Sequence, residues 1–163
     1  MQKQWTDNVM PSDFGQKNIL LQKLCDAFNQ SPFLSHNQLY MRISAQQEIE
    51  AIFNMQSHLM GNVAFSILHG GVTASILDSI GGIVAMAKIY ELANPDQFEV
   101  AIEKVTRLAT LDIRIDYIAP GRGQYFIAQA EALRLGNKSC LMRMHLHNDQ
   151  NQLIATGIAS YAY

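Results

Sequence analysis

Residues 70–92 read GGVTASILDSIGGIVAMAKIYEL, and this stretch decides the fold of the 163-residue chain. Its apolar residues leave hardly any polar face, which predicts a buried helix; they are Val72, Ile76, Leu77, Ile80, Ile83, Val84, Met86 and Ile89. A helix that is apolar on all sides needs a surface that covers most of them. An antiparallel sheet of five or six strands, curled around the helix, is the economical solution.

The segments on both sides of this helix supply the strands of such a sheet. Alternating apolar residues predict two strands before it, over residues 39–43 and 49–55. Four strands are expected after it, at about 111–117, 124–135, 142–146 and 153–163. Helical spacing over 17–29 adds an N-terminal helix behind an extended lead-in over 1–16, and 94–106 is expected to be a loop with some helical turns.

This order of elements predicts an α+β hotdog fold, in which the sheet wraps around one long buried helix. No internal repeat or low-complexity tract interrupts it. We divide the chain into a lead-in and extra helix over residues 1–35 and a hotdog domain over residues 36–163.

Composition excludes several kinds of partner. The formal net charge is −2 and no run of Lys or Arg occurs, so we expect no nucleic acid and no membrane partner. The N-terminal residues lack the apolar run of a signal peptide, and no apolar stretch approaches about 20 residues. The two cysteines, Cys25 and Cys140, have no second ligand at metal spacing and are expected to be reduced core thiols. A cytoplasmic protein is therefore expected.

Asp78 is the only ionisable residue between Gly71 and Lys88. Burying an unpaired carboxylate in an apolar helix costs several kcal/mol, so this residue needs a partner or a function. The alternative is that Asp78 lies on a solvent-facing side of the helix. The functional hypothesis is a carboxylate that acts on a substrate.

The start of the helix exposes bare backbone, because Gly70 and Gly71 follow His69 where a cap and first turn belong. Unpaired N–H groups at a helix N-terminus suit a polarised carbonyl oxygen or an oxyanion. Gly70 is the first candidate donor. Asp78 lies eight residues further on, which corresponds to about 12 Å of helix. One chain cannot aim both groups at one carbonyl, so a two-fold dimer with two shared sites is expected.

The chain resembles the hotdog-fold acyl-CoA thioesterases of the phenylacetyl-CoA (PaaI-like) type from about Leu39 to the C-terminus. The matching motifs are Gly61-Asn62, Leu68-His69-Gly70-Gly71-Val72, Leu77-Asp78-Ser79, Thr110-Leu111-Asp112 and Asp116-Tyr117-Ile118-Ala119-Pro120. One departure is that Val63 to Leu68 is rich in apolar residues and lacks the Pro that often follows the Asn. The resemblance implies hydrolysis of an acyl-CoA or aryl-CoA thioester without metal or organic cofactor.

The resemblance also implies roles for individual residues. Asp78 would be the general base or nucleophile, and the Gly70 N–H would polarise the thioester carbonyl. His69 would hold the thioester oxygen or the helix start, Asn62 would position water or the leaving group, and Thr110 would orient the water beside Asp78. Asn62, His69 and Gly70 would face Asp78 and Thr110 of the other subunit. His69 as a capping residue and Thr110 as an ordinary strand residue are the alternatives.

The CoA phosphates need cations and close backbone approach. Gly71, Arg107, Arg134 and Lys138 are the candidate substrate-binding residues, and ordinary solvated surface is the alternative for each cation. His145 and His147 share a strand face and are expected to form a polar stripe, not a metal site. A homodimer is expected, with a tetramer of two dimers also open. The competing functions are a non-catalytic hotdog module that binds acyl-CoA, acyl chains or a protein, and, ranked last, a dehydratase acting on an acyl carrier protein.

Overall fold

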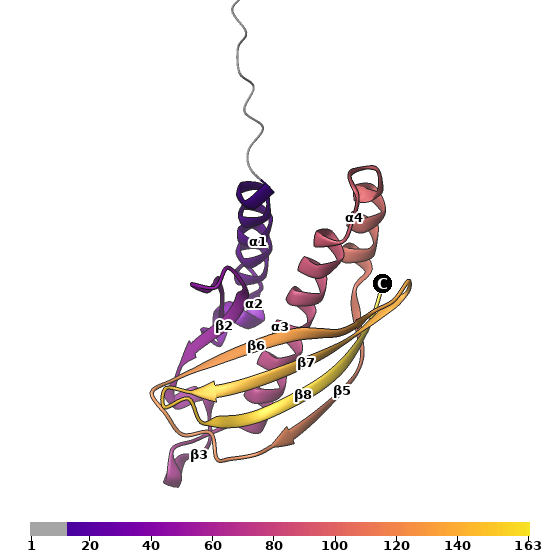
Figure 1. The fold of residues 1–163 in the computed structure, drawn as a ribbon. Coiled ribbons are helices and arrows are strands. Elements are labelled where there is room, and N and C mark those ends of the chain that lie inside the picture. Colours follow the sequence, from indigo (N-terminus) through magenta and orange to yellow (C-terminus); the bar gives the residue numbers. More distant parts are fainter. Residues whose placement is uncertain (1–12) are drawn as a thin grey trace, which may run out of the picture.

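A six-stranded antiparallel sheet forms the frame of the protein (Figure 1). The structure, a computed structural model, describes residues 13–163. The strand order is β1-β2-β6-β7-β8-β5, and every neighbouring pair is antiparallel. The strands are β1 (Tyr40–Ile43), β2 (Ile49–Asn54), β5 (Ala109–Tyr117), β6 (Tyr125–Leu135), β7 (Ser139–Asn148) and β8 (Leu153–Ala162). All six strands expected from the sequence are present.

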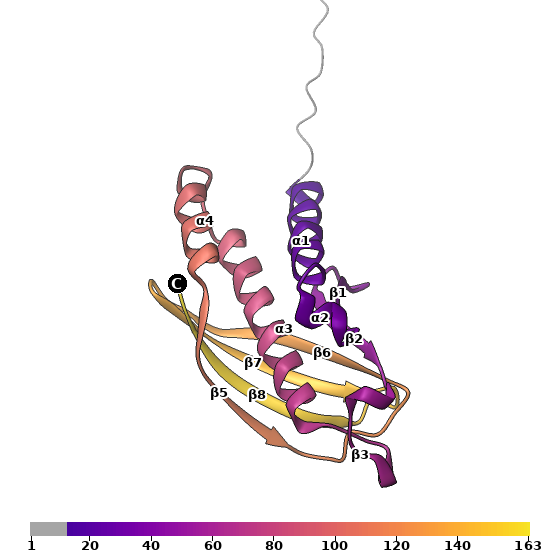
Figure 2. The same cartoon turned by 180° about the vertical axis from the view of Figure 1, so that it is seen from behind.

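The long helix α3 (Gly70–Glu91) crosses the inner face of the sheet, which curves around it (Figures 1 and 2). Ile76, Leu77 and Ile80 in its middle have no exposed surface. The strands present small and flexible apolar side chains to it, because alternate residues of a strand share one face; those of β7 include Met142, Met144 and Leu146, all fully buried. The hotdog fold predicted from the sequence is confirmed.

Helix α1 (Asp13–Asn29) packs beside α3 and against the edge strand β1. Leu21, Leu24 and Cys25 belong to the same core as the sheet. The Asn29 side chain accepts a hydrogen bond from Met41 N–H at 2.8 Å and donates one to Met41 C=O at 2.9 Å, which satisfies open backbone groups of β1. The lead-in predicted over 1–16 is wrong from Asp13 onward, and residues 1–12 lie outside the described residues.

Several short elements were not predicted. They are α2 (Pro32–His36), the one-turn helices at Ser57–Leu59, Val63–Phe65 and Pro95–Gln97, and the small hairpin of β3 (Met60–Asn62) and β4 (Ile67–Leu68). A full helix, α4 (Phe98–Arg107), stands where a loop with helical turns was expected. It forms because Ala101 and Val105, four residues apart, bury against Ile89 at the end of α3.

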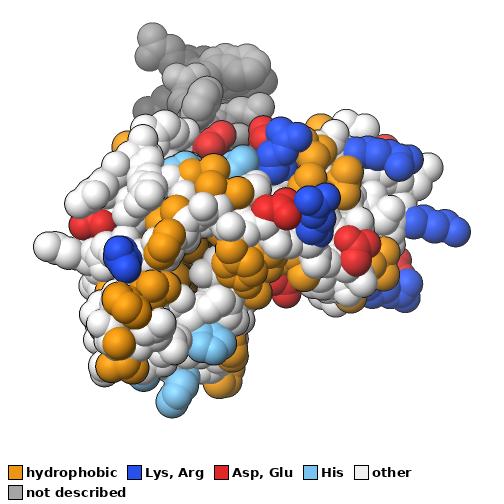
Figure 3. All heavy atoms as spheres, turned by 90° about the horizontal axis from the view of Figure 1, so that it is seen from below, with side chains coloured by type: hydrophobic (Ala, Val, Ile, Leu, Met, Phe, Trp, Pro, Cys, Tyr) orange, Lys and Arg blue, Asp and Glu red, His pale blue; other side chains and the backbone are white. Residues whose placement is uncertain are grey.

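The β5 edge of the sheet is much more exposed than the β1 edge. β5 pairs only with β8, and Leu111, Tyr117 and the following Ile118 are 64%, 57% and 56% exposed. Val63 and Phe65 at the tip of the β3–β4 hairpin are also exposed. Figure 3 views the molecule from the side where β3, the start of α3 and the end of β5 lie in Figure 1, and hydrophobic side chains are spread across this face.

Helix α3 is long and apolar enough to cross a membrane by length and composition, with a mean hydropathy of 1.5. The sequence expectation that no stretch approaches this length is therefore wrong. Within the fold, 56% of the most apolar part of α3 is buried. The apolar character of the helix is accounted for by its packing against the sheet.

Candidate active site

Asp78 and Thr110 are brought together within one chain. The Thr110 hydroxyl donates a 2.9 Å hydrogen bond to Oδ1 of Asp78, and the Asp78 side chain is half-buried. A carboxylate that is half-buried and held through Oδ1 by a hydroxyl can accept a proton from a bound molecule.

A β-bulge in β5 places Thr110 on the side of the sheet that faces α3. Thr110 pairs with Tyr161 of β8, whereas Asp112 pairs with the adjacent Ser160, so Leu111 is the extra residue. Without the bulge, strict alternation would put Thr110 on the outer face with Asp112 and Arg114. The bulge is therefore the feature that lets Thr110 reach Asp78.

Tyr161, to which no sequence motif points, also contacts Asp78. Its hydroxyl donates to the main-chain carbonyl of Asp78 at 2.8 Å, and the residue is 1% exposed. Burial, together with the nearby Asp78 charge, raises the pKa of Tyr161, so the phenol stays protonated. Gly81 leaves room for it, because a Cβ at that position would overlap the Tyr161 oxygen. The adjacent glycines Gly81 and Gly82 are the signal in the sequence for this close approach of helix and sheet.

The start of α3 is capped by His69. Nδ1 of His69 accepts a hydrogen bond from the Gly71 N–H at 2.8 Å, and its carbonyl accepts from Val72 and Thr73. An accepting Nδ1 leaves the proton of a neutral imidazole on Nε2, where it points away from the cap. The structure thus shows the capping contact that was one of the two alternatives for His69.

The Gly70 N–H differs from that of Gly71, because it has no hydrogen-bond acceptor among the described residues. Its carbonyl accepts a 2.8 Å hydrogen bond from the Tyr117 hydroxyl. The Gly71 N–H is engaged by His69, so the predicted contact of Gly71 with substrate does not involve that group. Gly70 therefore offers the free donor at this helix end.

Asn62 lies on the same side as the start of α3. It ends β3, and the preceding Gly61 packs so closely on His69 that an added Cβ would lie 2.9 Å from the His69 Cα. The His69 N–H also bonds to Leu59 C=O at 2.8 Å, which ties the hairpin to the helix start. The Asn62 side chain is exposed and accessible to a bound molecule.

The two groups of candidate residues are separated along α3. Gly70 is its first residue and Asp78 its ninth, so the rise of the helix places them about 12 Å apart along the axis. Asn62, His69 and Gly70 form one group at the helix start, and Asp78 and Thr110 form the other. Each chain therefore carries the candidate residues in two separate groups.

The three candidate cations gather near the Thr110 end of β5. Ala109, Ala162 and Ser139 are aligned across β5, β8 and β7, so the end of α4 and the β6–β7 turn lie at the same margin of the sheet. Arg107 closes α4 and pairs with Glu103 at 2.8 Å, while Arg134 and Lys138 flank the turn and are exposed. Three cationic side chains therefore lie at one margin of the sheet, and one of them is paired with a carboxylate.

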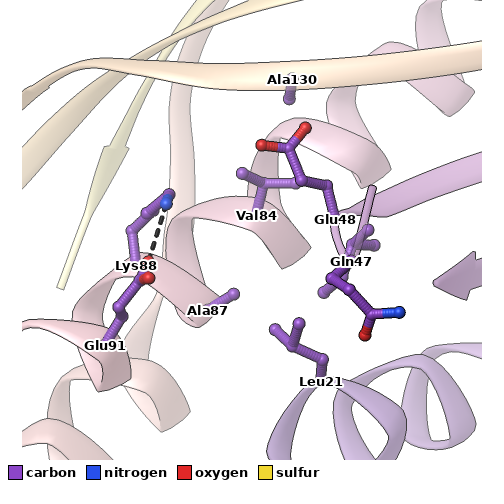
Figure 4. A pocket seen from close by; sticks show the side chains of 9 residues that line it. Leu21, Gln47, Glu48, Val84, Ala87, Lys88, Glu91 and Ala130 are labelled. Atoms are coloured by element: carbon purple, nitrogen blue, oxygen red, sulfur yellow. Dashed lines mark hydrogen bonds and ion pairs between the residues drawn. The ribbon is translucent and has the colours of Figure 1, made fainter. Parts of the chain in front are cut away.

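Two hollows lie away from Asp78 and Gly70. One of about 60 Å³ lies between α1, the β1–β2 turn, α3 and β6, and has room for a few water molecules only (Figure 4). Glu48 and Val84 line it, beside the ion pair of Lys88 and Glu91. The other, of about 330 Å³, opens between the end of α3, α4 and the β6–β7 turn. Neither is lined by Asp78 or Gly70.

His145 and His147 lie on the outer face of β7, with ring centroids 6.3 Å apart. Burial, and secondarily the neighbouring His145, lowers the pKa of His147. Residues 13–163 hold no group of three or more His, Cys, Asp or Glu side chains that could bind a metal ion.

The chain matches known proteins over most of its length. Residues 65–155, which include Asp78 and Thr110, match the model of the thioesterase superfamily. The medium/long-chain acyl-CoA thioesterase YigI of Salmonella typhimurium is 41% identical over 112 residues, covering 67% of this chain and 70% of that protein. YigI of Escherichia coli K12 is 40% identical with the same coverage.

A solved structure agrees with these relatives. A protein from Shewanella oneidensis related to the thioesterase superfamily superposes with a TM-score of 0.82 at 34% identity, covering 90% of this chain and 97% of that one. This match covers more of the chain than the family model does. The chain belongs to the thioesterase superfamily.

Proposed function

We propose that this protein hydrolyses medium- or long-chain acyl-CoA thioesters to a free acid and CoA, with Asp78 as the general base. The observation that carries the proposal is the Asp78 carboxylate, held by Thr110 at 2.9 Å in the middle of an otherwise apolar helix. The names of the two YigI relatives support an acyl-CoA substrate and an aliphatic chain. The phenylacetyl-CoA type of specificity stays a prediction from motif resemblance.

In the proposed reaction, Asp78 takes a proton from a water molecule as its oxygen attacks the thioester carbonyl. Thr110 fixes the carboxylate through Oδ1, so that the other oxygen faces the water. The carbonyl becomes a tetrahedral oxyanion, which the free Gly70 N–H stabilises at the positive end of α3. Collapse breaks the carbon–sulfur bond and releases CoA thiolate, which takes up a proton from Asp78 or solvent.

This reaction requires Asp78 of one chain and Gly70 of another. The separation of about 12 Å along one helix prevents both from acting on one carbonyl within a chain. The open β5 edge, with exposed Leu111 and Tyr117, supports pairing of two chains there, since an unpaired apolar edge is a natural surface for a second copy. A two-fold axis at this edge gives two equivalent sites.

His69 and Asn62 are the proposed companions of Gly70. The Nε2–H of His69 is free to donate, because Nδ1 is used in capping the helix. Asn62 is exposed beside it and carries an amide that can bind water or the leaving group. Arg107, Arg134 and Lys138 would bind CoA phosphates at the sheet margin near Thr110.

Steady-state release of thiol from short, medium, long and aromatic acyl-CoAs tests the proposal. The wild-type dimer is expected to prefer medium or long chains, and Asp78→Asn to lose at least about a hundredfold in kcat, since it removes the base. Binding of acyl-CoA without release of thiol would instead support the non-catalytic hotdog module. Full activity of Asp78→Asn would reject Asp78 as the base.

Mixed dimers test the shared site. Asp78→Asn subunits mixed with Gly70→Pro subunits, which lack the N–H donor, form heterodimers that contain one intact site. Activity should return to about a quarter of the wild-type level per total protein if subunits mix at random, because half of the dimers then hold one of two sites. If the subunits are shown to exchange and the mixture still recovers no thioesterase activity, the site is not shared between two chains.

A further inference from the structure

Tyr161 links β8 to the backbone of α3 at the position of the proposed base. Its hydroxyl donates to the Asp78 carbonyl at 2.8 Å, and its ring is buried against the helix. In an α-helix the same carbonyl also accepts the N–H of the residue four positions on, which is Gly82. The Asp78 carbonyl therefore has two donors, one from the helix and one from the sheet.

The helix is locally weak at this point, because Gly81 and Gly82 are poor helix formers. Gly81 is required by the contact itself: a Cβ there would overlap the Tyr161 oxygen and lie 3.1 Å from Sδ of Met144. The two glycines lower the helix propensity of the turn after Asp78. The missing side chain at Gly81 leaves space for the Tyr161 hydroxyl. The hydrogen bond from the Tyr161 hydroxyl restrains the turn of α3 that Gly81 and Gly82 make weaker.

Tyr161 and Thr110 both contact Asp78 from the paired strands β5 and β8. They are paired residues in the β5–β8 ladder, so their positions relative to each other are set by the sheet. Thr110 holds the carboxylate, and Tyr161 holds the main-chain carbonyl of the same residue. A shift of α3 along its axis would break one of these bonds or lengthen both.

We propose that Tyr161 is a positioning residue that fixes the height and rotation of Asp78 over the β5–β8 ladder, so that the carboxylate meets Thr110 and the attacking water. The inference rests on the proposed role of Asp78. Tyr161 itself is buried behind the helix and acts through Asp78. Its raised pKa keeps the hydroxyl protonated, and a protonated hydroxyl is needed to donate to a carbonyl.

The test compares Tyr161→Phe with Tyr163→Phe. Both variants keep a ring and remove a hydroxyl that bonds to backbone carbonyls. Tyr163, directly after β8, bonds to Gly136 C=O at 2.7 Å and Ser139 C=O at 3.2 Å. Only Tyr161→Phe should lower kcat, by about tenfold to about a hundredfold with KM within about twofold, because the misplacement affects the reacting groups. Equal kcat values for the two variants overturn the proposal.

A double variant separates positioning of Asp78 from other effects. In the Asp78→Asn background, Tyr161→Phe should cause no further loss of the residual rate, because both changes remove the same contribution. A further tenfold loss there would show that Tyr161 acts independently of Asp78. That result contradicts the inference and leaves the thioesterase proposal intact.

Amide hydrogen exchange provides a readout that needs no activity. The Gly82 N–H, which bonds to the Asp78 carbonyl, should exchange at least about tenfold faster in Tyr161→Phe than in Tyr163→Phe, since the restraint on this turn is gone. Unchanged exchange overturns the inference. Faster exchange in a protein that releases no thiol from any acyl-CoA would support the restraint while rejecting the proposed function.

Discussion

Tyr117 donates its hydroxyl to the main-chain carbonyl of Gly70 at 2.8 Å, so the first residue of α3 is tied to the end of β5. The same kind of bond joins Tyr161 to Asp78 eight residues later. The two tyrosines come from strands that pair with each other, and each holds the backbone of one half-site. Helix α3 is therefore restrained by the sheet at the two points where the proposed chemistry needs accuracy.

Removing the Tyr117 hydroxyl should loosen the Gly70 end. Tyr117→Phe is expected to lower kcat by roughly threefold to tenfold, because the oxyanion donor is less well placed. Its effect on the free energy of unfolding should be below about 1 kcal/mol, since Tyr117 is 57% exposed. Tyr40→Phe, at an exposed tyrosine on the far edge of the sheet, is the control for steady-state kinetics. If Tyr117→Phe has the same kcat as this control, Tyr117 does not position Gly70 for the reaction.

The Thr110 hydroxyl, and not the shape of the side chain, should matter for catalysis. Thr110→Val keeps the branched shape and removes the donor to Asp78, so kcat should fall by about tenfold to about a hundredfold. Thr110→Ser keeps the hydroxyl and should stay within about fivefold of wild type. The kcat values of both variants and of the wild type, measured on the same acyl-CoA substrate, distinguish the hydroxyl from the shape of the side chain. A serine variant as slow as the valine variant would point to packing instead.

The sequence predicted the long helix and the six strands, because apolar periodicity reports directly on burial. It could not predict how Thr110 reaches Asp78. Counting alternate residues from Ile113 back to Thr110 assigns Thr110 to the outer face, and only the bulge at Leu111 reverses this. A bulge depends on pairing with β8, which local sequence does not encode.

The contribution of Tyr161 was hidden for a related reason. The residue lies 83 positions from Asp78 and reads as an ordinary aromatic residue in a strand. Gly81-Gly82 indicated a close approach but not what approaches. Helix α4 was missed because ten residues with mixed charges are marginal as an isolated helix, and burial of Ala101 and Val105 against Ile89 stabilises it.

A charge on the open edge strand should disrupt the proposed dimer. Leu111 is 64% exposed on β5, and Leu111→Lys would place an ammonium group at the proposed interface. We expect the dimer to dissociate at least tenfold more readily in sedimentation velocity, with loss of activity in proportion, because each site needs two chains. Leu133→Lys, at an exposed position on β6, should change neither. A stable and active Leu111→Lys dimer would exclude the β5 edge as the dimer interface.

The two cysteines should not react with thiol reagents in the native state. Cys25 and Cys140 are free and buried, with 0% and 3% exposure. Burial raises the pKa of Cys25 to about 11 and raises that of Cys140 as well, so little reactive thiolate is present near pH 8. Labelling by a chromogenic disulfide should therefore reach both thiols only after denaturation. Rapid labelling of the native protein would contradict this burial, and slow labelling makes the same reagent suitable for measuring CoA release.

Substitution by alanine at the adjacent residues Gly81 and Gly82 of α3 should change the stability of the protein in opposite directions. A Cβ at Gly81 would overlap the Tyr161 oxygen, so Gly81→Ala should destabilise the protein by about 1–3 kcal/mol. A Cβ at Gly82 meets only Tyr161 Cε1 at 3.6 Å and Leu108 Cδ2 at 3.8 Å, so Gly82→Ala should gain up to about 1 kcal/mol of helix propensity. Urea denaturation measures both.

The overlap with the Tyr161 oxygen also predicts how the two sites couple. Adding Tyr161→Phe to Gly81→Ala removes the atom that the new Cβ meets first, so part of the lost stability should return. Adding it to Gly82→Ala should show simple additivity. If Gly81→Ala is as stable as Gly82→Ala, or if the double variant recovers nothing, the fit of the phenol against this turn does not control the geometry of Asp78.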